Sequence, residues 1–141
     1  SNQPKFKLHS QLDNGQVADK EKSDGRAVIE VHRNDAGARG LSDNALVKVF
    51  NERGSCLAVL KISENITQGV VNIPTGAWLD PSKSDAISCV HGNPNVLTLD
   101  AGTSKLAQGP SSHTCLVEIE LYKNKPPNVT AFNPPKIIKS E

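Results

Sequence analysis

Short stretches of alternating apolar and polar residues predict β-strands at several places in this sequence. The clearest covers residues 114–122, where every second residue from Cys115 to Leu121 is apolar. Such alternation places one set of side chains on the buried face of a sheet and the other in solvent. Comparable patterns predict further strands over residues 26–33, 45–51, 55–63 and 70–74, and an extended segment entering the sheet over residues 3–13.

Turn-forming residues separate these strands and indicate how they connect. Residues 52–54 (Glu-Arg-Gly) form a tight connection, so residues 45–51 and 55–63 are predicted to form a hairpin. A short helix is predicted over residues 35–39, with an Asn-Asp pair at its start and Gly40 at its end. Short strands joined by turns, with one or two small helices, predict a mostly β barrel or sandwich.

Residues 91–109 fit the strand pattern least well, because amides, hydroxyls and glycines dominate them. Thr103 or Ser104 can cap a short helix over residues 105–108, and Gly109 would then end that helix. A capped helix start exposes unpaired backbone N–H groups, which suit a phosphate or a polar heterocycle. From composition alone, a plain surface loop with a helical turn is the favoured alternative.

Two further segments fall outside the strand pattern. Residues 14–26 are polar and charged and contain two turn pairs, so we expect a loop there. Residues 126–141 carry four prolines and predict an extended C-terminal arm that lies over a neighbour or is disordered. The sequence therefore predicts one main domain over residues 1–125, followed by this arm.

The composition fits a single globular domain and argues against several classes of protein. Hydrophobic residues make up 36% of the chain and charged residues 22%, which is typical neither of disordered nor of membrane-spanning chains. No apolar run approaches the roughly 20 residues that a transmembrane helix needs. The net charge is only +1 and aromatic residues make up 4% of the chain, so a nucleic-acid-binding surface is not predicted.

The cysteines, histidines and serines form no recognisable catalytic or metal-binding pattern. Cys56, Cys89 and Cys115 lie far apart in the sequence, whereas a structural zinc site needs about four ligands. An odd number of cysteines favours a reducing compartment. No serine is paired with a base and an acid in a nucleophile motif. The chain lacks methionine, which predicts a piece of a longer protein rather than a free-standing one.

Taken together, four segments resemble the C-terminal cofactor-binding domain of the molybdopterin oxidoreductases of the dimethyl-sulfoxide reductase family. The resemblance is closest to the biotin sulfoxide and trimethylamine N-oxide reductase branch. The segments are LHSQLD (8–13), DAGARGLSDNALVKVFNERG (35–54), GVVNIPTGAWLDP (69–81) and HGNPNVLTLDAGTSKLAQGPSSHTCLVEIE (91–120). Their order and spacing cover most of the chain between residues 8 and 122.

The resemblance implies a double-psi β-barrel that binds molybdopterin guanine dinucleotide, whose dithiolenes hold molybdenum. It implies a parent enzyme that reduces S-oxides or N-oxides by oxygen-atom transfer, with the remaining domains of that reductase and its small-molecule substrate as partners. This part alone would be inactive. Relatives of the biotin sulfoxide type are expected in the cytoplasm and those of the trimethylamine-oxide type in the periplasm, and the cysteines favour the cytoplasm. The alternative is a free-standing double-psi barrel that acts as a binding or assembly module.

The first matched segment carries three consecutive candidates for cofactor binding, His9, Ser10 and Gln11. An imidazole, a hydroxyl and an amide offer donors and acceptors suited to the edge of a pterin ring. Without the resemblance, they would be read as an exposed strand end. Trp78, the only tryptophan, could pack against the cofactor or plug one end of the barrel.

The last matched segment supplies the other candidates. Asn95 can present a bidentate amide to a pterin or guanine edge, or merely stabilise the turn in which it lies. Ser104 is placed for phosphate or pterin oxygens, and Gln108 for the edge of a heterocycle. Asp100 could accept from guanidine-like N–H groups, and His113 is expected near the cofactor. No catalytic residue or direct metal ligand is predicted in this chain.

Overall fold

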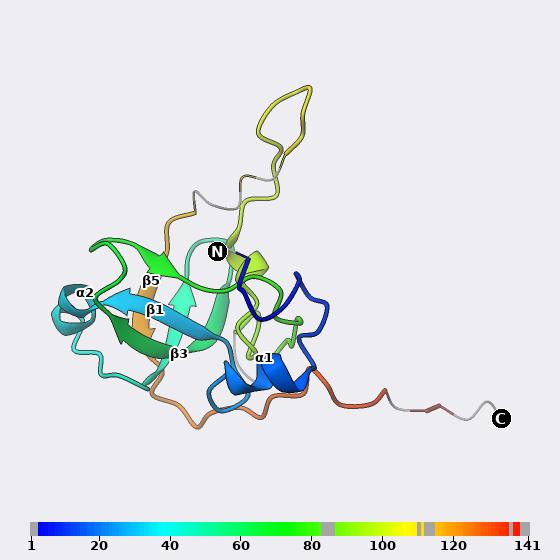
Figure 1. The fold of residues 1–141 in the computed structure, drawn as a ribbon, viewed down its shortest axis with the longest axis horizontal. Helices are drawn as coiled ribbons and strands as arrows, with labels where there is room; N and C mark the ends of the chain where they lie inside the picture. The colour runs from blue at the N-terminus through cyan, green and yellow to red at the C-terminus, as the bar shows by residue number, and fades with distance from the viewer. Residues whose placement is uncertain (1–2, 83–86, 110, 112–114, 136, 139–141) are drawn as a thin grey trace.

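The computed structural model describes residues 3–82, 87–109, 111, 115–135 and 137–138 (Figure 1). The elements follow in the order α1 (Gln16–Lys20), β1 (Val28–His32), α2 (Arg33–Ala38), β2 (Leu46–Phe50), β3 (Ser55–Ser63), β4 (Val71–Asn72), the 3-10 helix η1 (Pro94–Leu97) and β5 (Glu118–Leu121). Among the described residues, no helix has the length and apolar character that crossing a membrane requires.

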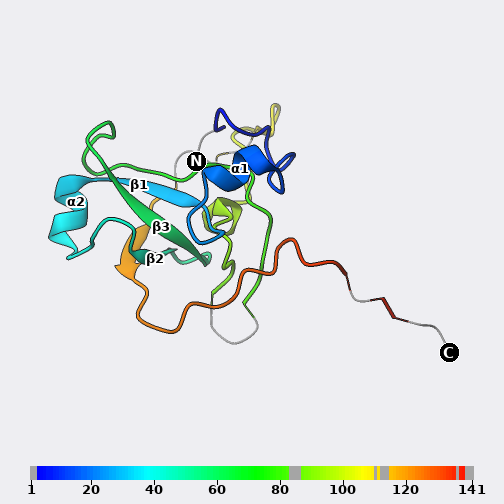
Figure 2. The same cartoon turned by 60° about the horizontal axis from the view of Figure 1, so that its bottom comes forward.

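The strands form one curled sheet, with the order β4-β1-β3-β2-β5 in the part of the chain described (Figures 1 and 2). β1 pairs with β3 in parallel, and the other neighbouring strands pair antiparallel. The predicted hairpin is confirmed, because β2 pairs directly with β3 and the Asn51 N–H donates to the Gly54 carbonyl at 3.0 Å. The prediction of a mostly β fold is also confirmed.

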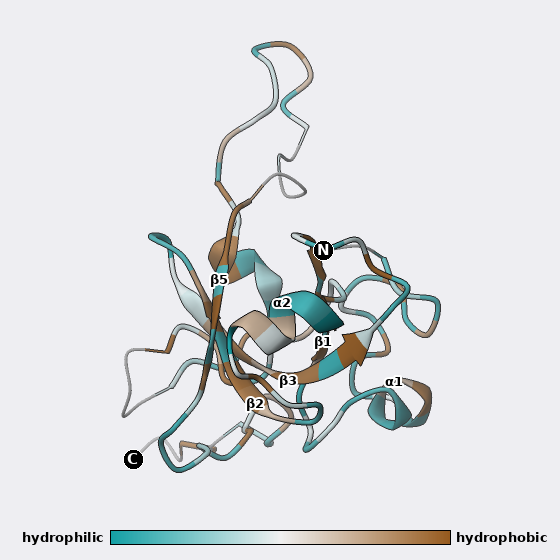
Figure 3. Cartoon of the chain, turned by 90° about the vertical axis from the view of Figure 1, so that its left-hand side faces the viewer, coloured by the Kyte–Doolittle hydropathy of each residue, from teal (hydrophilic) through white to brown (hydrophobic). Residues whose placement is uncertain are grey.

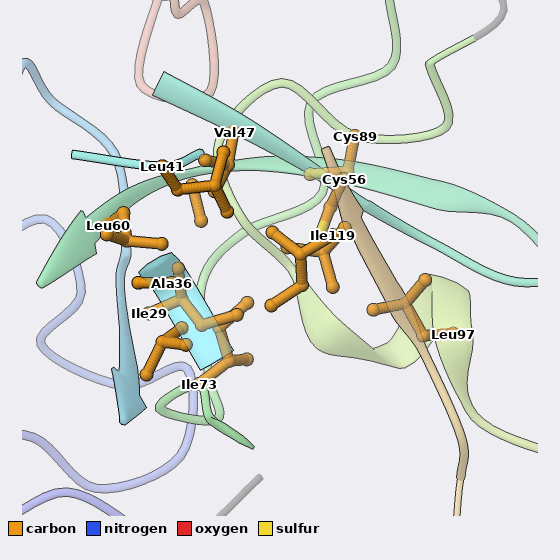
Figure 4. Packing of buried hydrophobic residues seen from close by; sticks show 13 residues of the cluster. Ile29, Ala36, Leu41, Val47, Cys56, Leu60, Ile73, Cys89, Leu97 and Ile119 are labelled. Carbon is orange, nitrogen blue, oxygen red and sulfur yellow. The ribbon is translucent and has the colours of Figure 1, made fainter. Parts of the chain in front are cut away.

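The hydrophobic core lies inside the curl of the sheet (Figure 4). β1 and β2 both alternate between partly buried and fully buried positions, as a half-buried strand requires. Ala36 of α2 and Leu97 of η1 pack into the same cluster. In β5 the alternation holds for Ile119, which is buried, but Leu121 is 45% exposed. β5 is an edge strand, so one side of Leu121 has no neighbouring strand to cover it.

The N-terminal segment differs from its prediction. Residues 3–13 form turns rather than an extended strand, with the Gln11 N–H donating to the Leu8 carbonyl at 2.9 Å. His9 and Leu12 have φ angles of +49° and +64°, which no strand contains. The physical reason is an ion pair within the segment: the Lys7 side chain turns inward to pair with buried Asp13, and this pairing overrides the short apolar alternation.

The helices also differ in part from the sequence prediction. α2 begins two residues earlier than predicted, because the Nδ1 of His32 accepts from the Asn34 N–H at 3.2 Å and caps the helix. Gly40, with φ +62°, follows its end as predicted. The expected loop over residues 14–26 contains α1, which buries Ala18. The predicted strand over residues 70–74 is reduced to the two residues of β4.

Candidate functional site

Two turns and the start of η1 meet at an open depression with a volume of about 420 Å³. It is lined by four of the predicted cofactor-binding residues, His9, Ser10, Trp78 and Asn95, and also by Thr75 and Gly76. These residues come from three of the four matched segments and converge only in the folded chain. Volumes of roughly 300–1,000 Å³ with a few convergent polar groups are typical of ligand sites.

Three of the polar side chains that line the depression are accessible to a ligand. Within the described part of the chain, the side chains of His9, Ser10 and Asn95 make no hydrogen bond, and their backbone groups alone are engaged. All three residues are exposed. An imidazole, a hydroxyl and a carboxamide together supply both donors and acceptors, as the edge of a pterin or a guanine requires.

A glycine brings the two turns into direct contact. A β-carbon placed on Gly76 would lie 1.7 Å from the carbonyl oxygen of His9, far inside any permitted contact. Gly76 also has φ +94°, which side chains disfavour. Only glycine therefore lets the turn at residues 75–79 reach the His9–Ser10 backbone and close the floor of the depression.

Trp78 fastens the same two turns through hydrogen bonds. Its indole Nε1 donates to the Ser10 carbonyl at 2.9 Å, and its backbone N–H donates to Oδ2 of Asp13 at 3.1 Å. The side chain is nevertheless 41% exposed, so part of the indole surface faces solvent at the depression. Trp78 thus combines a structural role with an accessible aromatic surface.

A buried polar cluster, which the sequence patterns did not reveal, supports the depression. The fully buried Asp13 carboxylate lies 2.6 Å from Nζ of Lys7 and 3.6 Å from Nζ of Lys22. Its other oxygen lies 3.9 Å from Nδ1 of His91. Buried charges need this kind of pairing, because an unpaired charge in the interior is costly. No periodicity could have shown it, since these residues lie in four separate positions of the sequence.

His91 is held neutral in this cluster. Its Nδ1 lies 3.0 Å from the Trp78 carbonyl, so Nδ1 must carry the proton to donate there. Burial is the main cause that lowers the pKa of His91, outweighing the hydrogen bond to Trp78 and the charge of Asp13. Its Nε2 is buried and has no partner among the described residues. His91 therefore acts as a neutral support beneath Trp78.

Asn93, rather than Asn95, stabilises the turn that begins η1. The Asn93 Oδ1 accepts from the Asn95 N–H at 2.9 Å, and Pro94 occupies the first turn of the helix. The Asn95 side chain plays no part in this cap and remains available at the depression. Of the two roles considered for Asn95, stabilising the turn therefore belongs to Asn93, and binding the cofactor stays a prediction for Asn95.

The remaining predicted residues lie elsewhere. Ser104 and Gln108 belong to a loop that protrudes from the body of the domain (Figures 1 and 3). The Ser104 Oγ accepts from the Ala107 N–H at 2.9 Å, but this closes a single turn and not the predicted helix over residues 105–108. The loop residues 101–108 are exposed, so no tertiary packing extends the turn.

Gln11 and Asp100 are exposed and do not line the depression, although Gln11 directly follows Ser10. His113 lies outside the described residues. A second cavity of about 340 Å³ opens into the core between β1 and β5, and apolar side chains form most of its lining. That cavity offers little to a polar ligand, and the depression beside Trp78 is the better candidate.

Comparison with known proteins identifies the class of domain that this fold and depression form. The family model "Molydopterin dinucleotide binding domain" matches residues 1–116. The chain belongs to this family of molybdopterin dinucleotide-binding domains, and the resemblance inferred from the four segments is confirmed.

Among its relatives, the chain is 44% identical to biotin sulfoxide reductase of Cereibacter sphaeroides, covering 86% of this chain and 16% of that protein. It is 47% identical to trimethylamine-N-oxide reductase of Salmonella typhi, covering 94% of this chain and 16% of that protein. The chain thus spans about a sixth of the length of these relatives. Acetylene hydratase from Pelobacter acetylenicus has a similar fold, with a TM-score of 0.66 at 18% identity over 86% of this chain and 18% of that one.

Proposed function

We propose that this chain is the molybdopterin guanine dinucleotide-binding part of a molybdenum oxidoreductase that reduces S-oxides or N-oxides by oxygen-atom transfer. The observation that carries the proposal is its identity of 44–47% to a biotin sulfoxide reductase and a trimethylamine-N-oxide reductase. The remaining domains of the parent reductase are its partners, and an S-oxide or N-oxide is the substrate. The bound cofactor would supply the molybdenum centre, which its dithiolenes hold.

The depression beside Trp78 fits part of such a cofactor. Its volume of about 420 Å³ suits one heterocyclic end of a dinucleotide, and the rest must extend beyond it. His9, Ser10 and Asn95 would hydrogen-bond the ring edge, and the exposed part of Trp78 would pack on its face. In this proposal the chain binds and orients the cofactor, and it supplies neither a metal ligand nor a catalytic group.

Gln11, Ser104 and Gln108 would contact another portion of the same extended molecule. Gln11 is exposed and directly follows Ser10, which lines the depression. The hydroxyl of Ser104 and the amide of Gln108 lie on the protruding loop, where few contacts of the domain compete for them. A dinucleotide is long enough to engage groups that do not share one pocket.

Two further properties belong to the same proposal. The double-psi β-barrel topology is supported by membership of the family and by the parallel pairing of β1 with β3, which α2 and β2 separate in the sequence. A cytoplasmic location is supported by the three free cysteines, Cys56, Cys89 and Cys115, which suit a reducing compartment.

The proposal is tested by chemical analysis of the full-length protein that contains this chain. We expect molybdenum and guanine nucleotide to be released on denaturation, with two nucleotides for each metal if two pterins hold it. Reduced-dye assays with a sulfoxide and an amine N-oxide should then show turnover of at least one. A full-length protein without molybdenum, tungsten or guanine nucleotide after expression in a cofactor-producing host would refute it.

A further inference from the structure

The C-terminal segment at residues 127–132 returns to the domain and is anchored beside Trp78. The buried Asp80 carboxylate accepts from the Thr130 N–H at 2.5 Å, the Thr130 hydroxyl at 2.6 Å and the Ala131 N–H at 3.0 Å. The guanidinium of Arg26 donates to the Pro127 carbonyl. Hydrogen bonds to a buried carboxylate are among the stronger ones in proteins, so this attachment is specific.

The anchored segment places an aromatic ring between the residues that support the site. The Phe132 ring lies 5.0 Å from the Trp78 ring at 67° and 5.0 Å from the His91 ring at 88°, both edge-to-face contacts. The ammonium group of Lys22 lies 4.4 Å from the centre of the same ring. Phe132 therefore contacts Trp78 directly and the buried polar cluster on two sides, yet it does not line the depression.

We propose that residues 127–132 act as a strap, and that Phe132 is a positioning residue that fixes Trp78, and through it the His9–Ser10 turn, for cofactor binding. This inference rests on the proposed function of the depression. The linkage runs through Trp78, whose indole donates to the Ser10 carbonyl and whose backbone N–H donates to Asp13. Without the Phe132 ring, the indole loses this edge-to-face contact, and the turn that the indole holds loses a constraint.

The test compares Phe132→Ala with Ile137→Ala in the full-length protein. Both variants remove an apolar side chain from the same arm, but Ile137 is 91% exposed. Hydrogen exchange measured by mass spectrometry should rise in peptides covering residues 9–13 and 76–79 of Phe132→Ala, while peptides from β3 keep their wild-type protection. Retention of the cofactor, measured as guanine nucleotide left after dilution, should fall roughly tenfold because the turn that binds it is less well fixed. Ile137→Ala should match wild type in both measurements.

Each outcome decides the question. Faster exchange throughout the domain, including β3, would mean that Phe132 merely stabilises the fold, and would overturn the strap. Unchanged exchange near Trp78, or cofactor retention equal to wild type, would overturn it as well. Asn95→Ala tests the proposed site independently of the strap, because Asn95 lines the depression itself. If Asn95→Ala loses cofactor and Phe132→Ala does not, the strap fails and the proposed site stands; if neither loses cofactor, both fail.

Discussion

Gly76 lies directly against the backbone of His9, so close that a β-carbon on Gly76 would meet the His9 carbonyl oxygen at 1.7 Å. This contact joins two segments that are more than sixty positions apart in the sequence, and the depression exists because of it. The hydrogen bond from the Trp78 indole to the Ser10 carbonyl fastens the same pair of turns. The candidate site is thus a junction between turns and does not lie on the face of the sheet.

Gly76→Ala should separate these turns, and Gly69→Ala is its matched control. Both glycines have positive φ angles, +94° and +80°, but a β-carbon at Gly69 would meet nothing within 4 Å. Each variant loses about 1 kcal/mol from backbone strain. Gly76→Ala should lose about 1–3 kcal/mol more through overpacking, and should shift the emission of Trp78 to longer wavelength. Urea unfolding of the isolated chain measures the difference; equal losses in both variants would contradict the contact.

Asp13→Asn should destabilise the domain strongly, because it leaves the ammonium group of Lys7 buried beside a neutral amide. Breaking one partner of a buried ion pair costs on the order of 3 kcal/mol. Asp19→Asn is the control, since Asp19 pairs with the same Lys22 through an exposed carboxylate. It should change the free energy of unfolding by less than about 1 kcal/mol. Similar losses in the two variants would show that Asp13 does not stabilise Lys7.

The pH dependence of stability should carry a contribution from His91. Burial lowers the pKa of His91 in the folded protein, so below about pH 6.5 the unfolded chain binds a proton that the folded chain does not. The stabilising contribution of the neutral His91 imidazole is therefore fully present above the pKa that His91 has in the unfolded chain. It falls as the pH drops towards the lowered folded value, below which the loss grows no further.

Urea unfolding of the isolated chain between about pH 7.5 and pH 5.5 measures this contribution. The free energy of unfolding should decline less steeply in His91→Gln than in wild type over that range. His9→Gln removes an exposed imidazole and should follow the wild-type curve. A His91→Gln curve parallel to that of wild type would contradict the account of His91.

Asn93→Ala should destabilise the domain and Asn95→Ala should not, although the two residues are near neighbours. Asn93→Ala removes the cap of η1 and should cost about 1 kcal/mol of stability. Asn95→Ala removes an amide with no hydrogen-bond partner among the described residues and should leave the unfolding midpoint within error of wild type. Thermal unfolding of both variants tests this division, and a lower midpoint for Asn95→Ala would contradict it.

The regular elements were predictable because they follow local rules. The hairpin of β2 and β3 shows in the alternation of residues 45–63 and in the turn between them, and β3 has the predicted bounds. The short helix α2 follows from its turn residues, apart from its cap. The sequence did not indicate that His32 caps this helix. Histidine rarely occupies the N-cap position, and the alternation of residues 26–33 already assigned His32 to a β-strand.

The candidate site could be predicted from the sequence only through the family resemblance. Long-range contacts bring together His9, Ser10, Trp78 and Asn95. The pattern of polar residues along the sequence does not indicate these contacts. The inward turn of Lys7 shows why: a lysine in an alternating segment indicates a solvent-facing position, whereas here it neutralises a buried aspartate. Arg26 and Asp80, which hold the C-terminal segment, escaped prediction for the same reason.

Cofactor retention by the full-length protein is the most direct test of the central claim, that the depression beside Trp78 binds the dinucleotide. Ser10→Ala and Asn95→Ala remove free polar groups from the depression, and Asn65→Ala removes an exposed amide that does not line it. Molybdenum and guanine nucleotide per chain should fall in the first two variants, with unchanged unfolding, and should stay at the wild-type level in Asn65→Ala. Full cofactor content in both Ser10→Ala and Asn95→Ala would contradict the account.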